Sequence, residues 1–308
     1  MTKVSIIITT YNRAIYLKQC IESILKQTLE IAISYEILII DNNSIDNTRA
    51  MVESFSNDRL KYFLETKQGK GFALNKGIEE AKGDYFIFTD DDVIVDAHWL
   101  NNLVHCFFTF NCDAVGGRVL PQYPANTPNW IRSHSEILKG PIVMFDYGQE
   151  TVKYQKPMLE FLGCNFAFKK EIFQEFGVFR TDIGPGKGII GDDTEFISRL
   201  FKKGKNLYYC GDAVVWHPVD IKRMNLKYVA QWNVSLGRYY ITSSSENLPD
   251  RSLTYYFGIP RYLLAEILQN ILSVIISFSI TNFLKRWSFL FIQIGRAIEI
   301  RNLYLLQK

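Results

Sequence analysis

The sequence is poor in the features that mark several other classes of protein. Its five cysteines include no CxxC pair, so neither a disulfide framework nor a zinc ribbon is indicated, and a reducing compartment is the expected setting. Glycine (19 residues) and proline (9 residues) are too scarce for a fibrous repeat. The longest stretch without charge, 267–284, contains several polar residues and falls short of the roughly 20 mostly apolar residues of a membrane-spanning helix. What remains is the composition of an ordinary enzyme, with 308 residues of which 47% are hydrophobic and 22% charged, enough for one large domain or two of ordinary size.

Neither sign of charge dominates the whole chain, whose net charge is +3, but the charge is unevenly distributed. Residues 1–220 carry 24 Lys and Arg against 28 Asp and Glu, a net −4, whereas residues 221–308 carry 11 against 4, a net +7. The basic C-terminal part therefore predicts an anionic partner.

The N-terminal part alternates between apolar runs and helical periodicity. Each apolar run is continuous, as in strands buried on both faces, and the alternation predicts a parallel α/β sheet. The expected strands are 4–8, 35–40, 60–64 and 85–88, and the expected helices are 15–25, 46–55 and 73–81. From about residue 113 the pattern is less regular and predicts mixed strands and loops, and from about residue 226 it becomes helical and basic.

Three of these strands end in polar, turn-forming clusters, which are TTYN at 9–12, DNNS at 41–44 and TDDD at 89–92. In open α/β sheets ligands bind beyond the carboxyl ends of the strands, so the clusters are expected to line one crevice. Asp90, Asp91 and Asp92 would repel one another unless a positive charge lay among them, and their oxygens suit Mg²⁺ or Mn²⁺. The alternative is a solvated loop that caps the next helix. The position at a strand end that faces two other polar ends favours the metal.

Two further segments have both a binding and a structural interpretation. Asp41, with the polar residues after it, can accept hydrogen bonds from a ribose or a base, or it can form an Asx turn that caps a helix. The segment 67–71 (KQGKG) offers backbone N–H groups and two ammonium groups, that of Lys70 included, where a diphosphate would lie. It is not a P-loop, since no GxxxxGK[ST] is present, and such stretches are often plain turns.

Later in the chain, carboxylates open a helical pattern and a histidine ends a strand. Asp192, Asp193 and Glu195 follow a glycine, where they can cap the helix or supply a general base for an incoming hydroxyl. His217 ends the apolar run in VVWH, and it is either a structural histidine or a third metal ligand.

Taken together, these segments resemble glycosyltransferase family 2 over residues 3–220. The similar segments, in order and spacing, are TTYNR (9–13), DNNSIDNT (41–48), residues 69–100, GCNFAFKKEIFQEFGVF (163–179), GDDTEF (191–196) and VVWH (214–217). The resemblance implies a GT-A fold, which is a Rossmann-like nucleotide-binding sheet with a mixed acceptor half. It also implies a nucleotide-diphosphate sugar donor, a divalent metal and inversion at the anomeric carbon.

The resemblance also implies roles for single residues. Asp193 matches the general base in a G-[ED]-D pattern, in which Asp192 replaces the commoner Glu. Asp90 and Asp92 match the ends of a DxD metal motif, which a run of three aspartates can adopt in more than one register, and His217 matches a metal ligand of some members. The residues expected to contact the nucleotide sugar are Thr9, Tyr11, Asp41, Lys70, Asp90 and Asp91. Those expected near the donor or acceptor sugar are Gly163, Cys164, Asn165 and Asp192.

The predicted organisation is a transferase domain over 1–222, with a nucleotide-sugar half (1–112) and an acceptor half (113–222), followed by a basic helical extension over 223–308. Aromatic and basic residues flank the apolar helical stretches of the extension, which favours a helix pair on an anionic membrane surface. Packing on the catalytic domain, self-association and a true span are the alternatives. The expected acceptor is a glycan or a lipid-linked glycan of an envelope or exported polysaccharide. The expected location is cytoplasmic, at the inner face of the membrane, and nucleic acid is not expected as a partner.

Two other function classes fit parts of the pattern. A metal-dependent sugar nucleotidyltransferase also uses acidic residues at strand ends, but it leaves GDDTE without a role. A non-catalytic nucleotide-sugar-binding module is expected to have lost carboxylates at the metal or base positions, and both sets are present.

Overall fold

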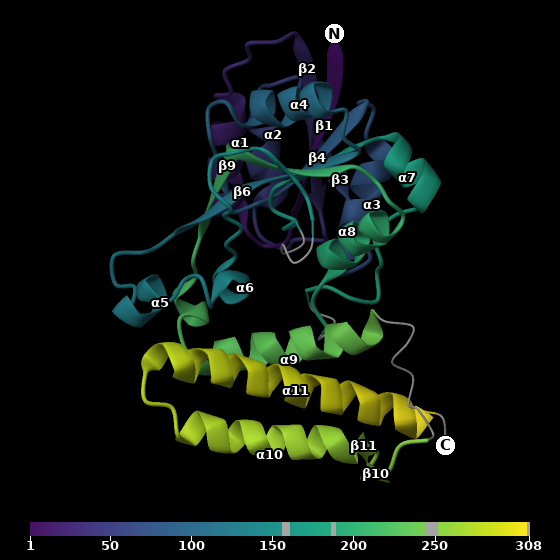
Figure 1. The fold of residues 1–308 in the computed structure, drawn as a ribbon. Coiled ribbons are helices and arrows are strands. Elements are labelled where there is room, and N and C mark those ends of the chain that lie inside the picture. The colour runs from purple at the N-terminus through teal and green to yellow at the C-terminus, as the bar shows by residue number, and fades with distance from the viewer. Residues whose placement is uncertain (156–160, 186–188, 244–251, 307–308) are drawn as a thin grey trace. The chain divides into compact units, whose positions relative to one another are not determined.

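A computed structural model describes residues 1–155, 161–185, 189–243 and 252–306 and divides the chain into two compact units (Figure 1). The first unit comprises Met1–Gln122, Val143–Pro185 and Asp192–Pro218. The second comprises Tyr123–Ile142, Gly186–Gly191 and Val219–Lys308.

The first unit is built on one mixed sheet. Its parallel part has the order β3 (Leu60–Leu64), β2 (Ile33–Asp41), β1 (Thr2–Thr10) and β4 (Tyr85–Asp90). The sheet continues through β8 (Phe166–Lys169), β6 (Ala114–Gln122), β9 (Leu207–Pro218) and β5 (Ile94–Val95), and β7 (Val152–Lys153) pairs with β9. Strand β8 is antiparallel to β4 and β6, and β5 and β7 are antiparallel to β9. The expectation of a Rossmann-like sheet joined to a mixed half is confirmed.

Helices lie between these strands along the chain. In the described part of the first unit they are α1 (Ala14–Leu25), α2 (Thr48–Glu53), α3 (Lys70–Glu80), α4 (Trp99–Phe110), α7 (Glu171–Phe176) and α8 (Asp192–Lys202). Helix α2 begins two residues later than the predicted 46–55, because the Asp46 carboxylate accepts the backbone N–H of Thr48 (3.0 Å) and so ends the preceding turn. Helix α3 begins three residues earlier than the predicted 73–81, after Gly69 at φ 138°, a conformation that favours glycine.

The strand centres form the core because their apolar runs face helices on both sides of the sheet. Ile6, Ile7 and Ile8 of β1 are fully buried, as are the central residues of β2 and β4. A group of phenylalanine rings around Phe88 and Phe168 joins the two halves of the sheet, with ring centroids 5.9 Å apart for this pair. The buried centres hold the strands in place, and so they also set where the polar clusters at the strand ends lie.

The second unit is mainly helical. Its described elements are α5 (Asn129–Ser133), α6 (Lys139–Ile142), a 3₁₀ turn (Ile221–Arg223), α9 (Leu226–Thr242), β10 (Tyr255–Tyr256), β11 (Ile259–Pro260), α10 (Arg261–Ile275) and α11 (Ile280–Leu306). Helices α9 and α11 approach closely, since a Cβ at Gly237 would lie 2.0 Å from the Ile292 carbonyl oxygen and one at Gly295 would lie 2.1 Å from that of Val234. Helix α10 packs on α11, which separates it from α9 (Figure 1). None of the described helices combines the length and the apolar content needed to cross a membrane.

Candidate active site

The polar ends of β1, β2 and β4 meet in the first unit. In the sheet register Thr9 lies opposite Asp90 of β4, and Thr10 lies opposite Asp41 of β2. The loops after β1 and β2 are joined by the Asn12 side chain, whose oxygen accepts the Ile45 backbone N–H at 2.8 Å. The prediction that TTYN, DNNS and TDDD line one edge of the sheet is therefore confirmed by their geometry.

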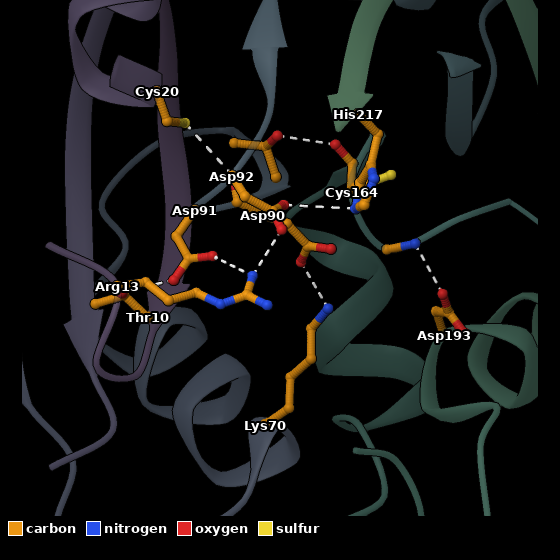
Figure 2. Close-up of polar contacts among 12 residues, drawn as sticks. Thr10, Arg13, Cys20, Lys70, Asp90, Asp91, Asp92, Cys164, Asp193 and His217 are labelled. Carbon is orange, nitrogen blue, oxygen red and sulfur yellow. Dashed lines mark hydrogen bonds and ion pairs between the residues drawn. The ribbon is translucent and has the colours of Figure 1, made fainter. Parts of the chain in front are cut away.

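Two cations and a hydroxyl group partner the three aspartates. Lys70 reaches from the start of α3 to the Asp90 carboxylate, with Nζ 2.6 Å from Oδ1. Arg13 Nη1 lies 2.6 Å from Asp92 Oδ2 and 3.1 Å from Asp91 Oδ1, and Asp91 also accepts the Thr10 hydroxyl at 2.7 Å. Figure 2 shows the three carboxylates surrounded by Arg13, Lys70 and His217.

Asp90, Asp92 and His217 also form a group suited to a metal ion. One potential ligand atom from each residue lies within 4.8 Å of the others. Asp92 Oδ1 is buried, accepts no hydrogen bond from the described residues and lies 3.4 Å from His217 Nε2, at the end of β9. Two carboxylates and an imidazole suit Mn²⁺, while the hard carboxylate oxygens also suit Mg²⁺. A buried carboxylate oxygen without a donor is the kind of atom that a bound cation would satisfy, so the residues fit the expected metal.

The pKa values of Asp90 and Asp91 are shifted in opposite directions. Burial and the neighbouring Asp92 charge raise the pKa of Asp91 to about 6, although Arg13 opposes the shift. Burial would raise the pKa of Asp90 as well, but Lys70 outweighs it and lowers that pKa below its ordinary value. Burial would lower the pKa of Lys70, yet Asp90, followed by Asp192 and Asp193, raises it, so the ammonium group stays charged. Lys70 thus places a fixed positive charge among these carboxylates.

The residues expected to contact the nucleoside are Thr9, Tyr11 and Asp41, at the same edge of the sheet. Thr9 is half-buried at the end of β1, and Tyr11 is 49% exposed. Asp41 accepts the Ser44 backbone N–H (2.8 Å), three residues further on, and the Tyr62 hydroxyl (2.7 Å), so it orders the loop after β2. Helix α2 begins only at Thr48, so Asp41 does not cap it. The binding role of these three residues stays a prediction.

Asp193 lies at the first turn of α8, next to the loop that carries Gly163. Its Oδ2 accepts the Gly163 backbone N–H at 2.8 Å and its Oδ1 accepts the Thr194 backbone N–H at 2.8 Å. Asp193 is half-buried, and Figure 2 shows its carboxylate at the edge of the group. Both oxygens accept backbone N–H groups, so the carboxylate is held in one orientation, as a general base requires.

Asp192 is buried, and its titration is expected to affect stability. Burial and the Asp193 charge raise its pKa to about 7, although Lys70 opposes the shift and Asp90 adds to it. The folded protein therefore keeps a proton that the unfolded chain releases near the ordinary value of 3.8, so this group's contribution to stability is lost as the pH rises from 3.8 through about 7. We expect the free energy of unfolding of the wild type to fall between about pH 5 and about pH 8, and that of Asp192→Asn to fall less, because asparagine does not titrate. Chemical unfolding at both pH values measures this, and Glu195→Gln, on the same helix, should keep the wild-type dependence.

In the segment 163–165, Cys164 and Asn165 make buried hydrogen bonds that hold the first unit together. The Cys164 carbonyl accepts the Thr89 hydroxyl (2.8 Å), and burial raises the pKa of its thiol well above the ordinary value. Asn165 is fully buried. Its side chain accepts the Trp99 indole N–H (2.8 Å) and donates to the carbonyls of Arg118 (2.9 Å) and Ala213 (2.8 Å). This amide therefore ties β8, α4, β6 and β9 together behind the crevice.

We expect Asn165→Ala to destabilise the first unit strongly. The substitution removes two buried hydrogen bonds, to Trp99 and Ala213, and a part-buried one to Arg118, at about 1–3 kcal/mol each, so the free energy of unfolding should fall by about 3 kcal/mol or more. Urea unfolding measures the change. Asn102→Ala, which loses one exposed hydrogen bond to the Asp212 carbonyl, is the matched control and should cost about 1 kcal/mol or less. An equal effect of the two substitutions would contradict this role of Asn165.

Sequence reasoning assigned no role to Arg13, and it named Thr10 only as part of TTYN. Two features of the sequence could have indicated the role of Arg13. The negative charge of the Asp90–Asp92 run requires cationic side chains as well as a metal, and Arg13 follows the end of the neighbouring strand by three residues. Asp90, Asp92 and His217, predicted as metal ligands, do lie near one another, and Lys70 contacts Asp90, while their binding roles stay predictions.

Comparisons with known proteins agree with this geometry. The family model described as "Glycosyl transferase family 2" matches residues 5–177. "Glycosyltransferase AglE" of Haloferax volcanii is 28% identical over 222 residues, which cover 70% of this chain and 66% of that protein. "GalNAc(5)-diNAcBac-PP-undecaprenol beta-1,3-glucosyltransferase" of Campylobacter jejuni is 38% identical over 96 residues, which cover 30% of each chain. The chain thus matches less than two thirds of the length of these relatives.

Among solved structures, one of similar fold is the "Mannosyltransferase PcManGT from Pyrobaculum calidifontis in complex with GDP-Man and Mn2+". The match has a TM-score of 0.56 at 18% sequence identity and covers 99% of this chain and 74% of that one. At this identity the match shows the fold.

Proposed function

Because the chain belongs to glycosyltransferase family 2, we propose that it transfers a sugar from a nucleotide-diphosphate sugar to an acceptor hydroxyl with inversion at the anomeric carbon. The observation that carries the proposal is the group of Asp90, Asp92 and His217, whose potential ligand atoms lie within 4.8 Å of one another, with Lys70 Nζ 2.6 Å from the Asp90 carboxylate. A cation for a diphosphate thus lies beside a group that can hold a metal.

In this proposal the metal-binding group and Lys70 act on the diphosphate, and Asp193 acts on the acceptor. Asp90, Asp92 and His217 would hold Mn²⁺ or Mg²⁺, which when bound neutralises charge on the leaving diphosphate. Lys70 holds further positive charge beside the same phosphates. Asp193 removes the acceptor proton while the acceptor oxygen bonds to the anomeric carbon. The bond from that carbon to the diphosphate oxygen breaks on the opposite face, so one displacement inverts the configuration.

The remaining predicted residues complete the binding site in this proposal. Thr9, Tyr11 and Asp41 contact the nucleoside, and Asp91 supports the donor site through Thr10 and Arg13. The loop 163–165 and Asp192 lie near the transferred sugar. Residues 1–222 form the transferase domain and residues 223–308 a helical extension. The acceptor is a lipid-linked or envelope glycan at the inner face of the membrane, in line with the lipid-linked substrate that the name of the Campylobacter jejuni relative gives.

The test begins with the donor. A thermal-shift screen of UDP-, GDP- and dTDP-sugars with Mn²⁺ selects the nucleotide sugar that stabilises the folded protein. Incubation of that donor with an acceptor should then release a nucleoside diphosphate. Release of pyrophosphate would instead identify a sugar nucleotidyltransferase, and binding without release of either product would identify a non-catalytic module.

A further inference from the structure

Helix α10 of the second unit has an apolar face toward solvent. Leu268, Leu272, Ile275 and Ile276 are all exposed, with Leu272 at 63% and Ile275 at 72%. Its carboxylate points the other way, since Glu266 accepts from Gln293 of α11 at 3.0 Å. A helix that faces water normally has the opposite arrangement.

A phenylalanine lies exposed just beyond each end of α10. Phe257 occupies the turn between β10 and β11, at 92% exposure and with φ 53°, a left-handed conformation that is unfavourable for a bulky side chain. Phe278 occupies the turn between α10 and α11 and is fully exposed. Neither ring is buried in the core of this unit.

The exposed charges of the C-terminal segment share one sign. In the described residues from 221 onward, every exposed charged side chain is basic, and they are Lys222, Lys227, Arg261, Lys285 and Arg301. The two carboxylates of this stretch point inward, Glu266 toward Gln293 and the buried Glu299 toward Arg238 at 2.8 Å. Arg261 begins α10, and Lys285 lies near the start of α11, the helix that follows α10.

We propose that α10, with Phe257 and Phe278, binds the surface of a lipid bilayer that carries anionic headgroups. A helix of this kind lies in the plane of the interface, with its apolar face about 5–10 Å deep and its cations among the headgroups. The 15 residues of α10 are too few to span the bilayer. A second copy of the chain is a poorer partner, because a symmetric contact would bring together two surfaces from segments that each carry a net +7.

Vesicle flotation of the full chain tests the proposal without any sugar donor, so its outcome is independent of transferase activity. We expect binding to vesicles of phosphatidylcholine with phosphatidylglycerol, and an at least tenfold weaker affinity for the double variant Leu272→Glu, Ile275→Glu. Lys285→Gln should weaken binding to the anionic vesicles roughly fivefold and leave the weaker binding to phosphatidylcholine unchanged. Phe108→Glu, which alters an exposed apolar residue of α4, is the matched control and should bind like the wild type.

A spectroscopic probe separates insertion from loose electrostatic contact. All five native cysteines are buried, so Phe278→Cys gives one exposed thiol for an environment-sensitive fluorophore. Anionic vesicles should shift its emission to shorter wavelength, whereas the same label at Phe108→Cys should not respond. The proposal would be overturned if the wild-type protein bound neither vesicle type, or if the emission of the label at position 278 did not shift. So would a dimer in sedimentation velocity that the double variant converts to a monomer, since a second copy would then cover α10.

Discussion

Replacing Asp193 by Asn is expected to reduce the rate of sugar transfer about 10²–10⁴-fold, the usual contribution of a positioned general base. The carboxylate is held by the backbone N–H groups of Gly163 and Thr194, both at 2.8 Å, so its orientation is set before an acceptor arrives. An asparagine has nearly the same size but cannot take up the acceptor proton. Release of nucleoside diphosphate under saturating donor and acceptor measures the loss.

Donor binding provides the second half of this test. Asp193 is not one of the residues grouped around the metal position, so the variant should bind the nucleotide sugar with Mn²⁺ nearly as tightly as the wild type. Glu195→Gln is the matched control, since Glu195 is a carboxylate in the same turn of α8 that pairs with Arg199 at 3.0 Å. That variant should keep its activity. Ordinary turnover by Asp193→Asn would show that another group accepts the proton.

The parallel half of the fold was predictable because its signal is local. Each strand is an unbroken apolar run, as in YEILII at 35–40, and such a run can be buried only between two layers of helices. The polar residues that end the strands then have a single place to lie, at the carboxyl edge of the sheet. For this reason Asp90, Asp92 and His217 could be grouped from the sequence although His217 is far from the other two along the chain.

The remaining interactions could not be predicted because they depend on distant backbone positions. Asn165 bonds Trp99, 66 residues earlier, and two carbonyls on β6 and β9, and no residue pattern specifies such a network. Arg13 presents a related difficulty. Its charge was visible, but its pairing with Asp91 and Asp92 follows from the close approach of the loops after β1 and β4. The start of α3 was missed by three residues because segment 67–71 looked like a plain turn.

Replacing Asp92 by Ala is expected to remove the part of nucleotide-sugar affinity that depends on a divalent cation. Asp92 Oδ1 is buried and has no hydrogen-bond donor among the residues that the structure describes, so its best partner is a cation shared with Asp90 and His217. Isothermal titration with the donor should show at least about tenfold weaker binding by the variant in Mn²⁺, and equal binding by variant and wild type in a chelator. Asp84→Asn, at the other end of β4, is the matched control and should bind like the wild type under both conditions.

The comparison in chelator decides between two roles of the same carboxylate. Asp92 also pairs with Arg13 at 2.6 Å, and loss of this pair alone would weaken donor binding equally with and without metal. Arg13 would still pair with Asp91 in the variant, and its side chain is 43% exposed, so the ion pair contributes little stability. Mn²⁺ should therefore raise the melting temperature of the wild type and have little effect on Asp92→Ala, because an ion stabilises only the protein whose folded state binds it. An equal loss of affinity in both conditions, with the Mn²⁺ stabilisation retained, would assign Asp92 to the ion pair and leave the metal to other ligands.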